Sequence, residues 1–222
     1  MSLDDQVLFS ARLKEATQSD HREAEGSEFI TTLMNGTRTS RDYVLLLSQY
    51  TYIYSALETE VRALAGDADL DPIFDLRLER LSKIQADLAS LLPGHGFSNI
   101  PEPLGATKEY VQHIRAAAGD PARLVAHHYL RYLGDLSGGQ IIGRLVERHY
   151  GIAQDDLTMW RFDGIDKHKP YKDEYRAKLD AYAVTPERVS SLLEEAAKGF
   201  TLNKALFRDL LTQSQQSALM SA

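Results

Sequence analysis

A helical repeat of apolar residues is the feature that most restricts how this chain of 222 residues folds. Apolar side chains recur three and four residues apart almost throughout, and no segment shows the convincing alternation that is typical of a strand. One such stripe runs from Tyr43 to Leu64, after the capping candidate Ser40 and before Gly66. The sequence therefore predicts an all-α fold.

Asp-Pro and Thr-Pro pairs mark the starts of three further helices, because a capping side chain there precedes a proline suited to the first turn. These helices are expected at roughly 71–94, 121–149 and 186–212, with shorter ones before Gly26 and around 107–118 and 170–182. Nothing in the chain resembles a linker between domains. We therefore predict one domain over residues 1–222, with a frayed tail at about 213–222.

Composition and charge exclude several classes of protein. The chain has no cysteine, which rules out disulfides, thiolate metal sites and cysteine nucleophiles. Its formal net charge of −7 argues against a nucleic-acid partner, because neutralising phosphates needs an excess of lysine and arginine. No run of about eighteen apolar residues predicts a membrane span. The stretch from Met1 to Asp5 is acidic where a secretory signal would be basic, so we expect a cytoplasmic protein.

Four glycines interrupt the helical pattern within the segment Gly134–Gly143. Each interior glycine costs about 0.5–1 kcal/mol relative to alanine, so something must offset them. Gly134 and Gly138 are four apart and share a face, which lets a flat ligand approach the backbone. Close helix packing or a kink is the alternative. Asp135, with Arg131 one turn earlier, adds ionisable groups beside that face, and packing explains these less well.

A second candidate site lies near the N-terminus. His21 and Glu25 are four apart and Lys14 lies seven before His21, so all three can share one helical face. A histidine there could be an axial metal ligand, with Glu25 orienting the imidazole. Spacing alone favours the alternative, a solvated face with charge pairs.

Two further groups of residues have both a functional and a structural interpretation. Lys172 and Arg176 place two cations on one face of an acidic protein and could receive an anionic ligand group, or they could pair with neighbouring acids such as Asp173. The second group consists of Phe200, Asn203 and Phe207. Such a set is more typical of a core with one capped polar side chain than of a pocket wall.

Several other kinds of catalytic or metal site are excluded, because the sequence lacks the motif or the structural element that each requires. Residues 136–140 match the signature loop of ABC-type ATPases, but the sequence has neither a GxxxxGK[ST] loop nor the strands of a parallel sheet. Repeated Glu-x-x-His pairs of a di-iron bundle are absent, and a Ser-His-Asp hydrolase needs a strand-to-helix elbow. The adjacent His127 and His128 point about 100° apart on a helix, so they cannot chelate one metal together.

Read together, these segments resemble the haem oxygenase family across most of the chain. The run Arg-Tyr-Leu-Gly-Asp-Leu-Ser-Gly-Gly-Gln is highly specific, and the chain looks like the soluble bacterial members because it lacks the C-terminal membrane anchor of animal forms. The resemblance implies an all-α fold with haem between a proximal and a distal helix. It is carried by Leu13 to Glu25, Tyr52 to Glu58, Tyr129 to Gln140, Tyr171 to Arg176, and Phe200 to Phe207.

The same resemblance implies a role for each matched residue on the proximal side and around the haem edge. His21 is the expected iron ligand, with Glu25 hydrogen-bonded to its other ring nitrogen. The expected contacts to the haem propionates and the pocket wall come from Lys14, Tyr129, Ser137, Lys172, Arg176, Phe200 and Phe207.

On the distal side, the resemblance implies that bare main chain covers the haem. Gly134, Gly138 and Gly139 are expected to lie over that face and to leave room for oxygen. A pocket without a bulky acid–base side chain favours attack on the porphyrin edge. The resemblance also implies a water network that delivers protons to the bound oxygen. Its expected members are Asp135, Tyr54, Arg131 and Asn203.

Haem is therefore expected to be both cofactor and substrate. The family reaction consumes oxygen and electrons from an external reductase, and releases biliverdin, carbon monoxide and ferrous iron. A ferredoxin or flavoprotein reductase is the expected partner, and a basic rim near Lys167, Lys169 and Lys172 could dock an acidic electron-transfer protein. The sequence is compatible with iron acquisition, bilin supply or detoxification.

Two other functions stay open. A haem carrier or sensor on the same fold would not turn over, and Asp135 and the distal glycines argue against it. A helical interaction module without a cofactor would leave the glycine cluster unexplained.

Overall fold

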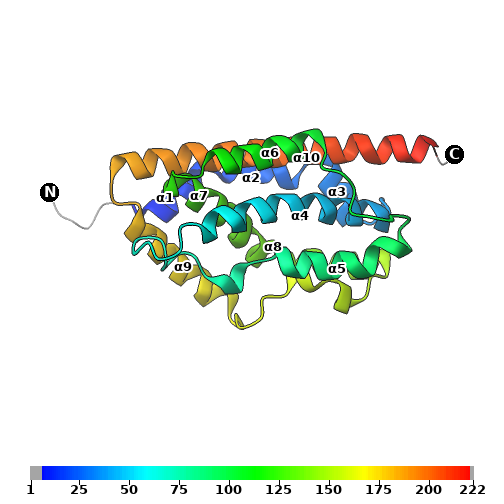
Figure 1. Cartoon of the computed structure of the whole chain (residues 1–222), viewed down its shortest axis with the longest axis horizontal. Coiled ribbons are helices and arrows are strands. Elements are labelled where there is room, and N and C mark those ends of the chain that lie inside the picture. Colours follow the sequence, from blue (N-terminus) through cyan, green and yellow to red (C-terminus); the bar gives the residue numbers. More distant parts are fainter. Residues whose placement is uncertain (1–6, 221–222) are drawn as a thin grey trace.

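The computed structural model describes residues 7–220 and confirms the all-α prediction, since no strand occurs among those residues (Figure 1). The stretch Met1 to Asp5 and the last two residues of the expected tail lie outside the described part. The α-helices are α1 (Phe9–Ala16), α2 (Gln18–Glu25), α3 (Glu28–Met34), α4 (Ser40–Arg62), α5 (Leu81–Gly94), α6 (Gly105–Ala116), α7 (Pro121–His128), α8 (Gly134–Tyr150), α9 (His168–Tyr182) and α10 (Pro186–Met220). Short 3-10 turns occupy Leu76–Leu78, Gln154–Asp156 and Thr158–Trp160.

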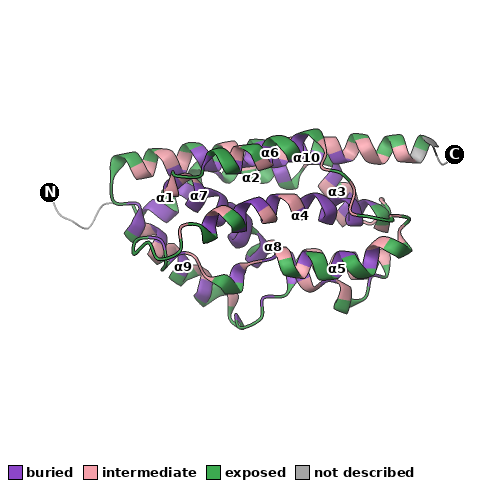
Figure 2. Ribbon diagram, in the orientation of Figure 1, coloured by how far each residue is buried: buried purple, intermediate pink, exposed green. Residues whose placement is uncertain are grey.

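Helix α4 runs through the centre of the molecule, with α6 and α10 along one side and α5 along the other (Figure 1). The predicted apolar stripe is buried along most of its length, and Tyr43 and Tyr54 are fully covered (Figure 2). The helix starts with a capping box, in which the Asp42 N–H donates to the Thr39 hydroxyl and the Thr39 N–H donates to the Asp42 carboxylate. Thr39 rather than the predicted Ser40 is therefore the N-cap.

The helix expected at roughly 121–149 consists of three parts. Helix α7 begins at Asp120, whose carboxylate accepts from the N–H groups of Ala122 and Arg123. A π-helical turn, η2 (Tyr129–Leu133), follows and joins α7 to α8. Such turns contain an extra residue and are frequent at functional sites. The sequence predicted the segment as helical but did not predict this change of winding.

Helix α5 begins later than predicted. The Asp71 carboxylate accepts from the N–H of Gly66 at 2.9 Å and closes a turn instead of capping a helix. Glu58 of α4 determines the start of α5, because its carboxylate accepts from the N–H groups of Arg80 and Leu81 at 2.7 and 2.9 Å. The predicted start at residues 71–72 is therefore wrong, whereas the predicted end at Gly94 is confirmed.

The segment before Gly26 is two helices rather than one. The break falls at Thr17, whose hydroxyl donates to the Leu13 carbonyl at 2.8 Å. Lys14 is exposed on α1, while His21 and Glu25 lie on α2, so the prediction that all three share one face of a continuous helix is wrong. Helix α3 was not predicted.

The last helix is longer than predicted. Helix α10 continues to Met220, through most of the segment expected to be a frayed tail, and its final turns project beyond the rest of the molecule (Figure 1). Within the described part of the chain, no helix combines the length and apolar character needed to span a membrane.

Candidate functional site

Four polar side chains predicted to act together meet in the interior. The hydroxyl of Tyr54 on α4 donates to the carboxylate of Asp135 on α8. Arg131 on η2 donates from Nη2 to the Tyr54 hydroxyl and from Nη1 to Oδ1 of Asn203 on α10, each at 3.0 Å. All four residues are buried, with exposed fractions from 0 to 8%. We call this set the distal network, and its members contact one another directly.

The distal network holds a buried charge. The Arg131 guanidinium lies 4.3 Å from the ring centre of Tyr50 and 4.7 Å from that of Tyr54, both within cation–π range. Burial raises the pKa of Asp135, although the Arg131 charge and the Tyr54 hydrogen bond act in the opposite direction. Asp135 therefore holds a proton at higher pH than an exposed aspartate does. The sequence analysis did not identify Tyr50 as part of this site. Its spacing of four residues from Tyr54 could have indicated that both rings lie on the same face of the helix.

The glycines of α8 divide into two pairs with different surroundings. A Cβ atom at Gly134 would meet nothing within 4 Å, and one at Gly138 would meet only a side-chain methyl at 3.9 Å. A Cβ atom at Gly139 would lie 2.8 Å from Cε3 of Trp160, and one at Gly143 would lie 3.4 Å from Cβ of the same residue. Close packing, the alternative interpretation of the glycine run, is confirmed for Gly139 and Gly143, while the space beside Gly134 and Gly138 is compatible with the approach of a flat ligand. Gly134 and Gly138 form the bare face, whereas Gly139 packs against Trp160.

Trp160 forms the support behind α8. Its indole N–H donates to the hydroxyl of Tyr43 on α4 at 3.0 Å, and the ring is buried against Gly139. The sequence analysis did not identify this residue. The signal was available, since Trp160 is the chain's one tryptophan and the four-residue spacing of Gly139 and Gly143 calls for a bulky neighbour.

The predicted iron ligand lies on α2 in an open setting. The His21 side chain is 51% exposed, and its Nδ1 lies 3.3 Å from Oε2 of Glu25. The edge of its ring faces Phe200 of α10, with the ring centres 5.9 Å apart. Among the described residues, none is hydrogen-bonded to its Nε2. The imidazole is thus oriented by one carboxylate and one aromatic ring, and its second nitrogen is available to a ligand.

Helix α10 ties the two sides of the site together. Phe200 contacts His21 on α2, and Asn203, three residues later, accepts from Arg131 beside α8. Lys204 donates to the carboxylate of Asp20 on α2 at 2.8 Å and so fixes the proximal helix. One turn of α10 therefore sets the position of the imidazole relative to the distal network. Phe207, one turn farther along, is buried in the core.

The predicted cations on α9 lie next to α8 and to each other. Lys172 donates to the Ser137 hydroxyl at 3.0 Å, and Arg176 donates to Asp173 at 2.8 Å. Burial, followed by the Arg176 charge, lowers the pKa of Lys172. The Arg176 charge also acts on Tyr129, whose pKa burial raises. The pairing with Asp173 is therefore confirmed for Arg176, while Lys172 is hydrogen-bonded to a hydroxyl instead of an acid.

A family model described as haem oxygenase matches residues 7–209 of the chain. The chain belongs to the haem oxygenase family. A haem oxygenase of Porphyra purpurea is 34% identical over 89% of this chain and 84% of its own length, and rat haem oxygenase 1 is 34% identical over 90% and 71%. Among solved structures, the Leptospira interrogans haem oxygenase matches with a TM-score of 0.84 and 32% identity, covering 90% of this chain and 98% of that one.

A second solved haem oxygenase, from the cyanobacterium Synechocystis in complex with haem, matches with a TM-score of 0.86 and 27% identity over 97% of each chain. The residues of the present haem oxygenase fit such a ligand. A flat anionic macrocycle needs an available imidazole, a face without side chains and cations at its edge. His21, the Gly134–Gly138 face and the pair of Lys172 and Arg176 supply these features.

Proposed function

We propose that this haem oxygenase cleaves haem to biliverdin, carbon monoxide and ferrous iron between His21 and the bare Gly134–Gly138 face, with the whole chain acting as one domain. The observation that supports turnover over storage is the distal network. Burying Arg131 and Asp135 is costly unless both are paired, and a haem carrier has no need of these groups. A proton-consuming reaction does need them.

On the proximal side, Nε2 of His21 would hold the haem iron, and haem when bound would supply the metal needed for oxygen activation. The Glu25 carboxylate lies 3.3 Å from Nδ1 and favours the ring orientation and the tautomer in which Nδ1 carries the hydrogen. Phe200 limits the tilt of the ring through its edge-to-face contact. The exposed imidazole and the neighbouring carboxylate support this assignment.

On the distal side, Asp135 holds and releases a proton at its carboxylate, and the Tyr54 hydroxyl orients that carboxylate by donating a hydrogen bond to it. Arg131 is the positioning residue of the network. It fixes the Tyr54 hydroxyl from one side and is held from the other by Asn203. Gly134 and Gly138 leave the space above the haem open to oxygen.

The edge of the haem is oriented by charge. Lys172 and Arg176 receive the propionates, with Tyr129, Ser137 and Lys14 completing the set. A carboxylate beside Lys172 relieves the repulsion that this lysine experiences from Arg176. Fixing the propionates fixes the in-plane rotation of the macrocycle, and hence the carbon that is attacked.

Electrons come from a separate protein in this proposal. Lys167 and Lys169 are exposed at the start of α9, next to the half-buried Lys172, and they form a basic rim beside the expected haem edge. An acidic ferredoxin or flavoprotein reductase in the cytoplasm would be steered to such a rim.

Reconstitution with hemin, oxygen and a reductant tests the proposal directly. We expect a one-to-one complex, followed by conversion of the haem band into a bilin spectrum with release of carbon monoxide. An intact haem band after full reduction in oxygen would support the carrier or sensor instead. Failure to form any stoichiometric complex would exclude both.

A further inference from the structure

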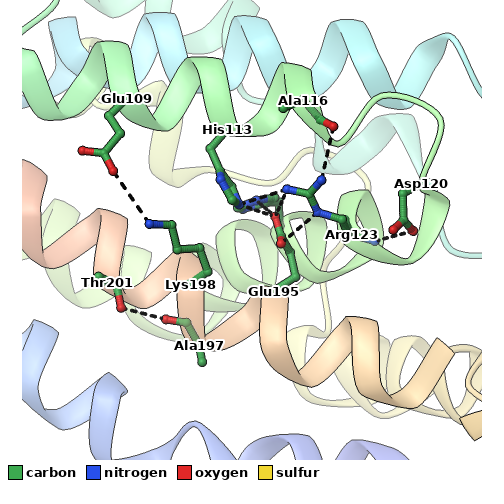
Figure 3. A network of polar contacts seen from close by, with 10 residues as sticks. Glu109, His113, Ala116, Asp120, Arg123, Glu195, Ala197, Lys198 and Thr201 are labelled. Atoms are coloured by element: carbon green, nitrogen blue, oxygen red, sulfur yellow. Dashed lines mark hydrogen bonds and ion pairs between the residues drawn. The ribbon is translucent and has the colours of Figure 1, made fainter. Parts of the chain in front are cut away.

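A second cluster of metal-ligating side chains lies outside the haem site, where α6, α7 and α10 meet (Figure 3). Nε2 of His113 on α6 lies 2.7 Å from Oε1 of Glu195 on α10, and Nε2 of His127 on α7 lies 2.8 Å from the same oxygen. The three possible ligand atoms all lie within 4.8 Å of one another. The His113 side chain is 22% exposed, while His127 and Glu195 are buried.

Two imidazole nitrogens and one carboxylate oxygen form the ligand set of open zinc sites, in which water occupies the fourth position. Ligand bonds of about 2.0–2.2 Å in a tetrahedron separate neighbouring ligand atoms by about 3.3 Å. The two contacts to Glu195 would therefore need to lengthen by only about half an ångström. We propose that His113, His127 and Glu195 bind a divalent transition-metal ion of the zinc type.

The side chains of the cluster already converge on one carboxylate oxygen. The Nε2 atoms of His113 and His127 both lie within 2.8 Å of Oε1 of Glu195, so a small outward shift of the rings would make room for an ion between the three. Binding through Nε2 of His127 would place the hydrogen of this imidazole on Nδ1.

The protein alone does not satisfy the donors and acceptors of the cluster. Nε2 of His113 lies 2.7 Å from Glu195 and 3.2 Å from Nη2 of Arg123, yet the same nitrogen of a neutral imidazole cannot both donate and accept. Nδ1 of His127 is buried without a hydrogen-bond partner. A cation bound by Nε2 of both rings would remove the first conflict.

Arg123 occupies the open side of the cluster and limits its affinity. Its Nε donates to Oε2 of Glu195 at 3.0 Å, where the guanidinium charge would repel an incoming cation. The side chain is a quarter exposed and already donates to the Ala116 carbonyl at 3.2 Å (Figure 3). It can therefore swing toward solvent when a metal enters, and its removal should strengthen binding.

An occupied site would join three helices that also support the distal network. Helix α7 leads directly into η2, which carries Arg131, and α10 carries Asn203. Binding to the folded state alone would raise the melting temperature progressively, with the logarithm of metal concentration once the site is saturated. The proposal does not depend on the proposed haem chemistry, because each measurement below is made without haem.

The test is a zinc titration of the untagged, haem-free chain. Binding is measured by calorimetry and by competition with a chromogenic chelator. We expect one site in the wild type, and tighter binding by about tenfold or more in Arg123→Gln. Glu195→Gln and His113→Ala should each weaken binding by about tenfold or more. His149→Ala and His21→Ala remove histidines elsewhere in the chain and should leave the affinity unchanged.

Thermal melting with and without zinc gives an independent readout. The wild type and Arg123→Gln should melt at higher temperature with the ion, and His113→Ala should not. His113→Ala also guards against misfolding, because this ligand is partly exposed at the rim of the cluster whereas Glu195 is buried. Absence of binding in Arg123→Gln, or equal affinity in wild type and His113→Ala, would overturn the proposal. Loss of binding in His21→Ala would assign the ion to α2 instead.

Discussion

The proximal and distal sides of the haem site differ in how far they are built into the fold. His21 and Glu25 are 51% and 68% exposed on a short helix, and their contact at 3.3 Å is loose for an ion pair. Tyr54, Arg131 and Asp135 are nearly inaccessible, and they join helices far apart in the sequence. The distal network is held by contacts within the protein, whereas Nε2 of His21, the proposed iron ligand, is hydrogen-bonded to none of the described residues.

This difference has an energetic origin. A buried charge that loses its partner is strongly unfavourable, so removing one member of the distal network should destabilise the folded state. An exposed imidazole is solvated by water and adds little to folding. Substitutions on the proximal side should therefore change activity with little change in the free energy of unfolding, whereas substitutions on the distal side can change both.

His21→Ala should have the largest effect on activity and almost none on folding. Loss of the axial nitrogen should nearly abolish bilin formation, while the free energy of unfolding should change by less than about 0.5 kcal/mol because the side chain is half exposed. Added imidazole should restore part of the activity. Bilin assays and denaturant unfolding measure both quantities, with Ser19→Ala on the same helix as the control. Unchanged haem spectra in His21→Ala would contradict the assignment.

Asp135→Asn should keep haem binding but slow bilin formation by about 10²-fold or more, because the isosteric amide cannot relay a proton. Single-turnover absorbance after oxygen is added measures the rate. Tyr54→Phe, which removes the hydroxyl but keeps the ring, should fall between this variant and the wild type. A normal bilin yield from Asp135→Asn would show that the proton comes from elsewhere.

The same variant has a predicted pH signature in stability. Burial raises the folded-state pKa of Asp135 above its ordinary value of 3.8, so the folded chain binds the proton more tightly than the unfolded chain. This contribution to stability is full below pH 3.8 and is lost as pH rises through the raised pKa. Asp135→Asn does not titrate there. From about pH 4 upward, the free energy of unfolding of the variant should therefore rise relative to that of the wild type. A difference between the two that does not change with pH would contradict the raised pKa.

Gly139→Ala and Gly134→Ala should change stability in opposite directions. A methyl group at position 139 would press on the buried Trp160 ring and cost about 1–3 kcal/mol. A methyl group at position 134 meets open space, so better helix propensity should gain about 0.5–1 kcal/mol in the haem-free chain. Its cost should appear in turnover, since it narrows the space for oxygen. Denaturant unfolding and bilin assays on the matched pair measure this, and equal destabilisation would remove the distinction between the two faces.

Lys172→Ala should have the smallest effect. Haem affinity should fall by about two- to fivefold through loss of one partly exposed cation, with unfolding free energy changed by less than about 0.5 kcal/mol. Lys172→Arg keeps the charge and should retain the affinity. Haem titration followed by difference absorbance measures both variants. A loss as large as that of His21→Ala would mean that the edge, rather than the iron, dominates binding.

Sequence analysis anticipated the fold class because the helical period is local information. It also predicted that Tyr54, Arg131, Asp135 and Asn203 form one network, and the structure brings them together. Spacing could pair only Arg131 with Asp135; the other two members depended on the resemblance, since the four residues come from three separate segments. For His21, periodicity favoured a solvated face, and the half-exposed side chain agrees with that too.

The features that the sequence analysis did not predict depend on contacts between residues far apart in the chain. The start of α5 is determined by Glu58, more than twenty residues earlier, and no local pattern near Asp71 reports that contact. The bare and packed glycine faces differ only through Trp160, which approaches from a separate segment. The cluster of His113 and Glu195 with His127 was likewise missed, because the test of chelation considered only neighbours on one helix.

The π-helical turn at Tyr129–Leu133 takes up one residue more than an α turn and so sets the phase between α7 and α8. An α-helix turns by about 100° for each residue, so a one-residue insertion or deletion that left this turn wound as it is would rotate α8 relative to α7. Asp135 would then leave the Tyr54 hydroxyl, and the bare glycines would face a different neighbour. Single side chains in this stretch can be exchanged without that rotation, whereas a change in its length cannot be made without either rewinding the turn or moving Asp135.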